Sequence, residues 1–450
     1  MAFLLSLPFF TALILFFIRS EKWARSLSVL SSLVTCVASF FLLLTASRAD
    51  TILLPWLPKL GIHFALGLSG ITPIMIALTG VVIPLILVST WTVPVKRASF
   101  FLGLVHVIQG ALFGVFMARD GFLFYFFWEA VVIASFFMIL IWGRDHRVRH
   151  AIVFLLYSIV SSFLLLGVLI FLYVHTPIPH QFDLTSLLST AQSGHVGTWF
   201  FWALCISFAI KIPLIPFHRW QPGTYASLPT PGSMVLGALV SKMGIYALIQ
   251  FVLPVVSHQS MILIFVIVSL LYASLLALTQ LHFKSLIAYV SIAHSSLIVA
   301  GLISGTIQGY QGAILQVVFH AILVVGLFLL ESITARGHQS LYFRKCFFLI
   351  LLGAISLPLT GGFVGEFMIL WGISLVSPVM AGVAGLSVIL GAWVMLNVYQ
   401  RFVLNPEQSY DPSQTLSIGE IFTLGFISLI IFALGIFPSY LLNLFNGGVL

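Results

Sequence analysis

The sequence predicts an all-α integral membrane protein of about fourteen transmembrane helices, forming a single membrane domain over residues 1–450. Hydrophobic residues make up 61% of the chain and charged residues only 7%, against about a quarter charged in soluble domains. Apolar runs long enough to cross a hydrocarbon core of about 30 Å recur from one end of the chain to the other. The basic residues lie mostly in the short connections between these runs. The chain is therefore predicted to be a helix bundle in a lipid bilayer.

The predicted spans follow from the roughly 20 apolar residues that a helix needs to cross a membrane. They fall near residues 2–17, 26–46, 69–91, 98–117, 121–142, 151–174, 199–217, 229–253, 260–280, 285–304, 310–332, 346–374, 379–400 and 417–440. The first span has no basic residue before it, and Arg19, Lys22 and Arg25 follow it. A cleaved signal peptide shows the opposite order, so we interpret this segment as a retained helix.

Loop charge tests this count, because connections after odd-numbered helices should all face the side opposite the N-terminus. Fourteen basic residues lie in those connections: Arg19, Lys22, Arg25, Lys96, Arg97, Arg144, Arg147, Arg149, Arg219, Lys284, Arg336, Arg344, Lys345 and Arg401. The connections after even-numbered helices carry three, namely Arg48, Lys59 and Arg119. The asymmetry predicts a multi-pass protein of a bacterial-type cytoplasmic membrane, or an equivalent energy-converting membrane, with both termini on the non-cytoplasmic side.

Charge and cysteine usage argue against other classes of protein. The formal charge of +8 comes from dispersed loop residues, so no nucleic-acid surface is predicted. Cys36, Cys205 and Cys346 lie far apart, and no group of histidines accompanies them. No metal site, iron–sulfur site or haem attachment is therefore predicted in this chain.

Ionisable side chains inside the predicted spans are the main candidates for function, because each costs roughly 2.5–3.5 kcal/mol at mid-bilayer. They are Glu129, Lys211, Lys242 and Glu366, with the histidines His106, His294 and His320 at comparable depth. Such a set could pass protons stepwise if water fills the gaps. Lysine suits this role better than arginine, because burial can make it release its proton. The alternative is that Glu129 and Lys211 form a structural ion pair and the histidines are hydrogen-bonded core residues.

Two spans contain helix-breaking residues beside these groups. Pro213 and Pro216 follow Lys211 in the seventh span, and Pro358 precedes Glu366 in the twelfth. Interrupted helices at matching positions of two halves are typical of inverted-repeat transporters. We therefore predict two inverted five-helix repeats, helices 4–8 over residues 98–253 and helices 9–13 over residues 260–400. Ordinary proline kinks are the alternative.

Several motifs make the chain resemble the antiporter-like subunits of proton-pumping NADH:quinone oxidoreductase, and among them the branch called chain M. The matching stretches are Phe127-Trp128-Glu129, Lys211-Ile212-Pro213, Pro216-Phe217-His218, Pro229-Thr230-Pro231-Gly232-Ser233, Ser241-Lys242-Met243-Gly244, Ile287-Ala288-Tyr289, Ser291-Ile292-Ala293-His294 and Phe363-Val364-Gly365-Glu366-Phe367-Met368. The similarity covers about residues 60–440, and the family's fourteen-helix fold with two inverted repeats agrees with the prediction above.

The resemblance implies a role for each buried ionisable group. Glu129 would tune Lys211, Lys242 would lie at the centre of the proton path, His294 and His320 would continue it, and Glu366 would be the terminal carrier. His106 and His218 are two further candidates. Quinone, flavin and iron–sulfur centres would belong to partner subunits, with no cofactor in this chain. The implied partners are other membrane subunits, including neighbouring antiporter-like chains, and a peripheral redox arm.

This sequence differs from the family's usual motifs at three places. The stretch Trp220–Tyr225 lacks the family's usual Asp and His, the connection at 336–345 is short, and an acidic residue is missing around Gly67–Gly70.

The chain could instead be a subunit of a multisubunit sodium/proton antiporter, although such chains typically carry lysine at the position of Glu366. It could also be a membrane subunit that supports its complex without moving ions.

Overall fold

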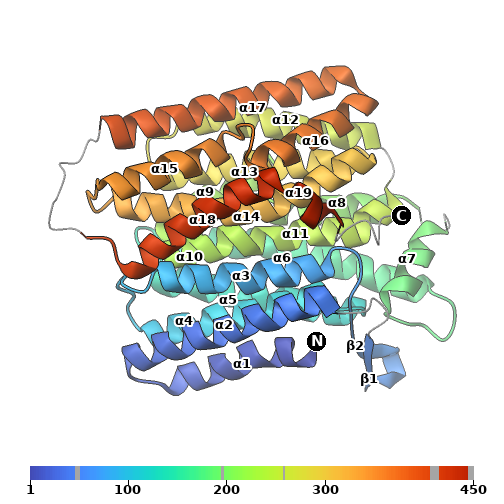
Figure 1. The fold of residues 1–450 in the computed structure, drawn as a ribbon. Helices are drawn as coiled ribbons and strands as arrows, with labels where there is room; N and C mark the ends of the chain where they lie inside the picture. Colours follow the sequence, from blue (N-terminus) through green and yellow to red (C-terminus); the bar gives the residue numbers. More distant parts are fainter. Residues whose placement is uncertain (46–50, 194–196, 257–258, 406–414, 444–450) are drawn as a thin grey trace. The chain divides into compact units, whose positions relative to one another are not determined.

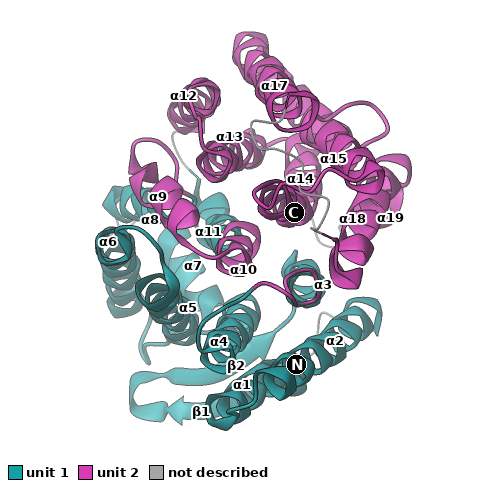
Figure 2. Cartoon of the chain, turned by 90° about the vertical axis from the view of Figure 1, so that its left-hand side faces the viewer, with its two compact units in different colours: residues 1–87, 94–212, 240–257 teal, residues 88–93, 213–239, 258–450 magenta. Residues whose placement is uncertain are grey.

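The computed structural model describes residues 1–45, 51–193, 197–256, 259–405 and 415–443. This part of the chain is helical apart from one two-stranded hairpin and its connections (Figure 1). The chain divides into two compact units, coloured separately in Figure 2. Unit 1 comprises residues 1–87, 94–212 and 240–257, and unit 2 comprises residues 88–93, 213–239 and 258–450.

Unit 1 holds the first eight α-helices, the hairpin and one later segment. Its elements are α1 (Ala2–Phe17), α2 (Glu21–Thr45), β1 (Thr51–Leu57), η1 (Pro58–Leu60), β2 (Ile62–Gly67), α3 (Thr72–Ser89), α4 (Ala98–Met117), α5 (Gly121–Trp142), α6 (Arg147–His175), α7 (Leu184–Gln192), α8 (Trp199–Lys211), α11 (Ser241–Ala247), η4 (Leu248–Val252) and η5 (Leu253–Val255). Apolar side chains fill these helices, and Asp120 caps α5 by accepting hydrogen bonds from the amides of Phe122 (2.9 Å) and Leu123 (3.1 Å).

Unit 2 holds the remaining helices. They are η2 (Phe217–Arg219), α9 (Trp220–Ser227), α10 (Thr230–Val235), η3 (Leu236–Val240), α12 (Gln259–Leu278), α13 (Phe283–Ile303), α14 (Ile307–Thr334), α15 (Leu341–Ala354), α16 (Gly361–Val376), α17 (Pro378–Tyr399), η6 (Gln400–Leu404), α18 (Ile418–Ile436) and α19 (Pro438–Asn443). The central helix is α14, whose most apolar stretch is completely buried. Within this unit α14 packs against α13, α16 and α18.

The hairpin in unit 1 was not predicted from the sequence. Strand β1 pairs antiparallel with β2, and Gly61 makes the turn in the left-handed conformation (φ 62°). The loop before α5 holds the hairpin, because the Asp120 carboxylate accepts a hydrogen bond from the His63 amide at 3.0 Å and the Arg119 amide donates to the Ala65 carbonyl at 2.8 Å. Prolines and unbroken apolar runs hide the alternation that would have marked the strands.

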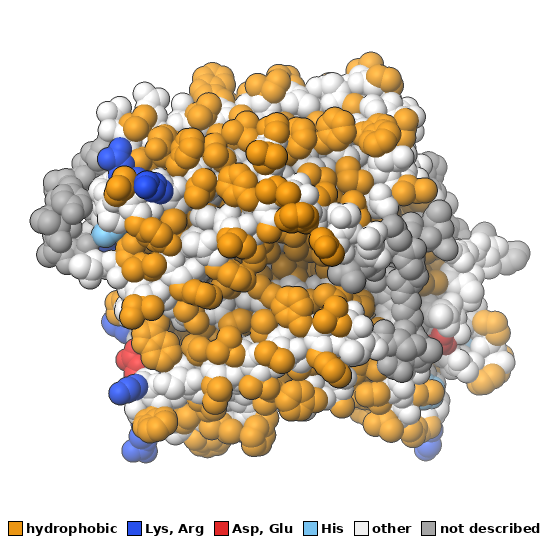
Figure 3. All heavy atoms as spheres, in the orientation of Figure 1, with side chains coloured by type: hydrophobic (Ala, Val, Ile, Leu, Met, Phe, Trp, Pro, Cys, Tyr) orange, Lys and Arg blue, Asp and Glu red, His pale blue; other side chains and the backbone are white. Residues whose placement is uncertain are grey.

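The described helices confirm the membrane class of the protein. Eleven of them are long and apolar enough to cross a membrane, and α1, α8 and α16 are shorter apolar helices. Figure 3 shows hydrophobic side chains along the lengths of the helices, with lysine and arginine side chains near helix ends. This surface suits contact with lipid. The total of fourteen transmembrane helices stays a prediction.

Three predicted segments have the same bounds as observed helices. The segments 2–17, 98–117 and 121–142 coincide with α1, α4 and α5. The predicted seventh span ends early, because α8 stops at Lys211, and the predicted twelfth span is two helices, α15 and α16. Both interruptions therefore lie where the prolines predicted them. Of the loop residues used for the charge comparison, Arg48 lies outside the described residues.

Candidate functional site

Lys211 is the last residue of α8, and it is almost completely buried, with 2% of its surface exposed. The helix cannot continue because Pro213 and Pro216 lack the amide hydrogens that further turns would need. The amine is thus carried at an interrupted helix end inside unit 1, as the sequence predicts.

The surroundings of the Lys211 amine are aromatic. Its Nζ lies 5.6 Å from the ring centroid of Trp128 on α5 and 5.4 Å from that of Phe154 on α6. Neither a hydrogen-bond acceptor for Nζ nor a partner for the Glu129 Oε1 atom occurs among the described residues. The ion pairs within 4.0 Å in that part of the chain do not include Glu129 with Lys211. The expected pairing of these two residues is therefore not made in this conformation.

Lys242 lies on α11, also in unit 1, and is fully buried. Its Nζ donates a hydrogen bond to the Ser241 hydroxyl at 3.3 Å. Helix α11 approaches α8 closely at Gly244, where an added Cβ would lie 3.2 Å from the Cβ of Lys211. The segments η3 and η4 on either side of α11 are π-helical, a distortion that is frequent at functional sites.

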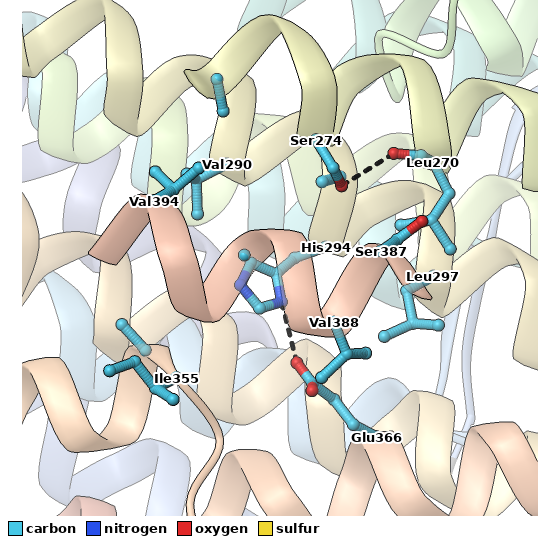
Figure 4. Close-up of a pocket in the computed structure, with 14 residues that line it drawn as sticks. Leu270, Ser274, Val290, His294, Leu297, Ile355, Glu366, Ser387, Val388 and Val394 are labelled. Atoms are coloured by element: carbon cyan, nitrogen blue, oxygen red, sulfur yellow. Dashed lines mark hydrogen bonds and ion pairs between the residues drawn. The ribbon is translucent and has the colours of Figure 1, made fainter. Parts of the chain in front are cut away.

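A second polar group lies within unit 2, where His294 on α13 meets Glu366 on α16. His294 Nδ1 and Glu366 Oε1 are 3.3 Å apart (Figure 4). The amide nitrogen of Gln316 on α14 contacts the same two atoms, at 3.2 Å and 3.3 Å. The ring of His320 lies 5.2 Å from that of His294, centroid to centroid. The structure thus brings together three of the predicted residues and adds Gln316.

This arrangement offers His294 two states. With a proton on Nδ1 the ring donates to the Glu366 carboxylate, and without one Nδ1 accepts from the Gln316 amide. Each state has a hydrogen-bond partner, so a proton can arrive and leave with little rearrangement. A cavity of about 40 Å³ borders the pair and is also lined by Ser274 and Ser387. That volume is enough to hold a water molecule.

Close helix packing positions Gln316 and Glu366. At Gly312 on α14, an added Cβ would lie only 2.7 Å from the carbonyl oxygen of Gly365 on α16. The break before α16 contains Ser356 and Leu359 in left-handed conformations (φ 57° and 79°). Thr360 then caps α16, so Glu366 lies in the second turn of the helix.

The two further histidine candidates lie elsewhere. His106 is fully buried between α4 and α2, with Nε2 2.9 Å from the Ser28 hydroxyl and Nδ1 3.0 Å from Gln109 Oε1. Both of its nitrogens are thus engaged in a network that continues to Thr35. In unit 2, His218 follows the break, and its ring lies 5.9 Å from that of Tyr289. In the described part of the chain, no hydrogen bond or ion pair joins either histidine to the groups above that lie in its own unit.

Sequence reasoning missed a further ionisable pair in unit 2, that of Lys284 with Glu331. Their side chains approach to 3.9 Å, and Lys284 also donates to the Leu228 carbonyl at 3.0 Å. Glu331 lines a cavity of about 440 Å³ with His282 and Arg401. The signal was present, since Glu331 falls at the end of the predicted span 310–332. Among the described residues, no group of three His, Cys, Asp or Glu side chains could hold a metal ion.

Comparisons with known proteins place the chain in a family. The family model described as "NADH:quinone oxidoreductase/Mrp antiporter, TM" matches residues 118–391. NADH-quinone oxidoreductase subunit M of Rickettsia typhi is 31% identical, over 98% of this chain and 96% of its own length. A chain in the structure of respiratory complex I from Thermus thermophilus with bound NADH is 26% identical, with a TM-score of 0.89, covering 99% of this chain and 98% of that one.

A more distant likeness shows the fold alone. The structure of the Mrp complex from Dietzia sp. contains a chain with a TM-score of 0.86 but 16% identity, covering 98% of this chain and 95% of its own. The family model and the near-complete match to subunit M relatives are decisive for membership. This chain belongs to the NADH:quinone oxidoreductase/Mrp antiporter transmembrane family.

Proposed function

We propose that this chain is a proton-translocating membrane subunit of a respiratory NADH:quinone oxidoreductase, coupled to quinone reduction elsewhere in the complex. The observation that carries the proposal is the placement of buried ionisable groups at two interrupted helices, Lys211 where α8 ends and Glu366 just after the break before α16. Buried ionisable residues on broken membrane helices are typical of ion pathways. The similarity to relatives named subunit M, which extends over nearly the whole chain, also supports the proposal.

The proposed relay begins at Lys211 and ends at Glu366. Electrostatic change from the redox arm alters the balance between Glu129 and Lys211, and Lys211 gives up its proton inward towards Lys242. The His294 and His320 group then receives a proton by way of water. Glu366 is the terminal carrier, since its carboxylate lies 3.3 Å from the His294 ring.

The proposal also assigns the redox chemistry to partners. Proton transfer by carboxylates, amines and imidazoles needs no redox centre, and we propose that the quinone, flavin and iron–sulfur chemistry belongs to other subunits. We propose that neighbouring antiporter-like chains and a peripheral redox arm complete the complex. The names of the relatives, and the complex in which the similar chain occurs, support this assignment.

The inverted repeats and the orientation are part of the same proposal. The repeats comprise helices 4–8 (residues 98–253) and 9–13 (residues 260–400), and the two interruptions five helices apart support them. Both chain termini lie on the non-cytoplasmic side, supported by the excess of basic residues in the connections after odd-numbered helices.

The test is proton pumping by the assembled complex in vesicles supplied with its electron donor. Lys211→Ala and Glu366→Gln should each lower pumping by about a hundredfold, because each removes a positioned proton carrier. Lys345→Ala, which changes an exposed lysine of α15, should pump like the wild type. Subunit composition of the purified complex checks that every variant assembles.

Two results would contradict the proposal. Full pumping by both relay variants would favour a supporting subunit that moves no ions. Sodium-dependent proton flux without any electron donor would favour a sodium/proton antiporter subunit, for which the present likeness to the Mrp complex shows the fold alone.

A further inference from the structure

We propose that Trp128 and Phe154 form an aromatic holding site for the Lys211 ammonium group, occupied when that group is not paired with Glu129. The two rings would then be positioning residues of the relay, acting through Lys211. This inference rests on the proposed function and adds a second defined position for the lysine.

The geometry of the amine carries the proposal. Both ring centroids lie within about 6 Å of Lys211 Nζ, the range of a cation–π contact, at 5.6 Å and 5.4 Å. The rings come from different helices, α5 and α6, and both are fully buried. Cation–π attraction is stronger where water is excluded, so the two faces together offer the cation a defined site.

The Lys211 amine has no hydrogen-bond partner among the described residues that could stabilise its charge in place of the rings. Among the described residues the protein offers Nζ no hydrogen-bond acceptor, and Glu129 does not approach within 4.0 Å. A buried ammonium group needs compensation for its lost hydration. The electron-rich ring faces provide it for the cation and give little to the neutral amine. The site therefore favours a lysine that has left the carboxylate but still carries its proton.

Neighbouring contacts hold the site in place. Trp128 packs against Phe124 and Phe208, at centroid distances of 5.8 Å and 5.9 Å. Helix α6 is fixed to α8 by two reciprocal hydrogen bonds of 2.8 Å, from the Ser161 hydroxyl to the Ser207 carbonyl and from the Ser207 hydroxyl to the Ser161 carbonyl. Ser207 lies one helical turn before Lys211. These hydrogen bonds therefore hold α6, which carries the Phe154 ring, against α8, which carries the Lys211 amine.

Trp128 and Glu129 are adjacent on α5, so the two alternative partners of the Lys211 amine, a ring face and a carboxylate, come from neighbouring residues. The flexible four-carbon stem of lysine can move its charge between a carboxylate and a ring face without moving a helix. Glu129 of α5 is a charged group that acts electrostatically on Lys211, and α11, which approaches α8 at Gly244, carries Lys242. After Arg149, helix α6 carries His150, Tyr157, Tyr173 and His175 but no Asp, Glu, Lys or Arg, and η4 carries no ionisable residue.

The test replaces Phe154 with phenylalanine carrying one, two and three ring fluorines, in the complete complex in vesicles. Fluorine withdraws electron density from the ring face with little change in shape, so it weakens the cation–π contact in steps. The relay starts from a protonated Lys211, so pumping should fall at high pH, where this lysine loses its proton. Because fluorination removes stabilisation from the protonated form, this fall should begin about 0.5 to 1 pH unit lower for the trifluoro ring. The same series at Phe124, which is buried and packs against Trp128, is the matched control and should leave the pH profile unchanged.

A pH profile that is flat across the Phe154 series would overturn the inference, as would equal shifts at Phe154 and Phe124. Phe154→Leu should show the full shift, and Phe154→Trp should retain most of the wild-type profile. Lys211→Ala separates this idea from the proposed function. If that variant loses pumping while the fluorine series is flat, only the aromatic holding site fails; if it pumps normally, the relay itself is wrong.

Discussion

The Glu366 carboxylate contacts both His294 and Gln316, and these two residues also contact each other. A glutamine placed between an imidazole and a carboxylate costs little in either protonation state, because its amide can donate to whichever acceptor is available. Its neutrality is also why a search for buried ionisable residues passes over it. Gln316 lies one turn before His320 on α14, so helix geometry alone could have nominated it.

Outside the membrane-spanning helices, Asp183 shows how pH should act on a cap. Burial by itself would raise the pKa of Asp183, but hydrogen bonds from the side chains and amides of Ser186 and Thr185 outweigh it and hold the pKa below its usual value. Asp183 accepts from the Ser186 amide at 3.0 Å at the start of α7. Because the ionised form is favoured in the folded state, its contribution is present above the unfolded pKa of about 3.9 and is lost as pH falls.

Asp183→Ala should therefore destabilise the protein by about 1 kcal/mol near pH 7. The difference from wild type should shrink as the pH falls through 4 towards the folded-state pKa, because protonation removes the same acceptor from the wild type. Thermal unfolding of the detergent-solubilised complex at pH 7 and at successively lower pH measures this difference in stability. Asp145→Ala, at an exposed carboxylate, is the control and should change the midpoint little. A destabilisation that does not depend on pH would contradict the capping account.

At the scale of elements, the contact between α14 and α16 decides whether Gln316 reaches Glu366. Gly312 is at a close approach of the two helices, where an added Cβ would meet the Gly365 carbonyl oxygen at 2.7 Å and the Ile369 amide nitrogen at 2.8 Å. Both are backbone atoms, so neither can turn aside as a flexible side chain could. A side chain at this position must push the helices apart.

Gly312→Ala should lower the thermal unfolding midpoint by several degrees, from a loss of about 1–3 kcal/mol, and should also reduce pumping. Gly382→Ala on α17 is the matched control, since nothing lies within 4 Å of its added Cβ. That variant should be neutral or slightly more stable, because alanine favours helix. Equal effects of the two substitutions would show that helix propensity, not the helix contact, governs them.

At the scale of the whole molecule, the loop charges make a prediction about topology. A single cysteine at Lys59 should react with a membrane-impermeant maleimide added to intact cells, and a single cysteine at Lys345 should react only after permeabilisation. Both positions are exposed, so accessibility to solvent is matched. Cys36, Cys205 and Cys346 are replaced first. The reverse labelling pattern would invert the proposed orientation.

The breaks after α8 and before α16 were predictable, because proline acts locally and its effect needs no partner. The hairpin Thr51–Gly67 was not, because it is held by Asp120 and Arg119 from a distant part of the chain. The same holds for Trp128 and Phe154, whose rings meet Lys211 only because α5, α6 and α8 pack together.

The sequence by itself determined the membrane class, the approximate spans, the two interruptions and the identity of the buried acids, amines and histidines. These follow from local hydrophobicity and proline chemistry, which act within some 20 residues. Only the tertiary structure decided which of these groups meet: His294 with Glu366 through Gln316, and Lys211 with two aromatic rings rather than with Glu129. Those encounters depend on helix rotation and on close approaches such as Gly312 to Gly365, and long-range packing fixes both.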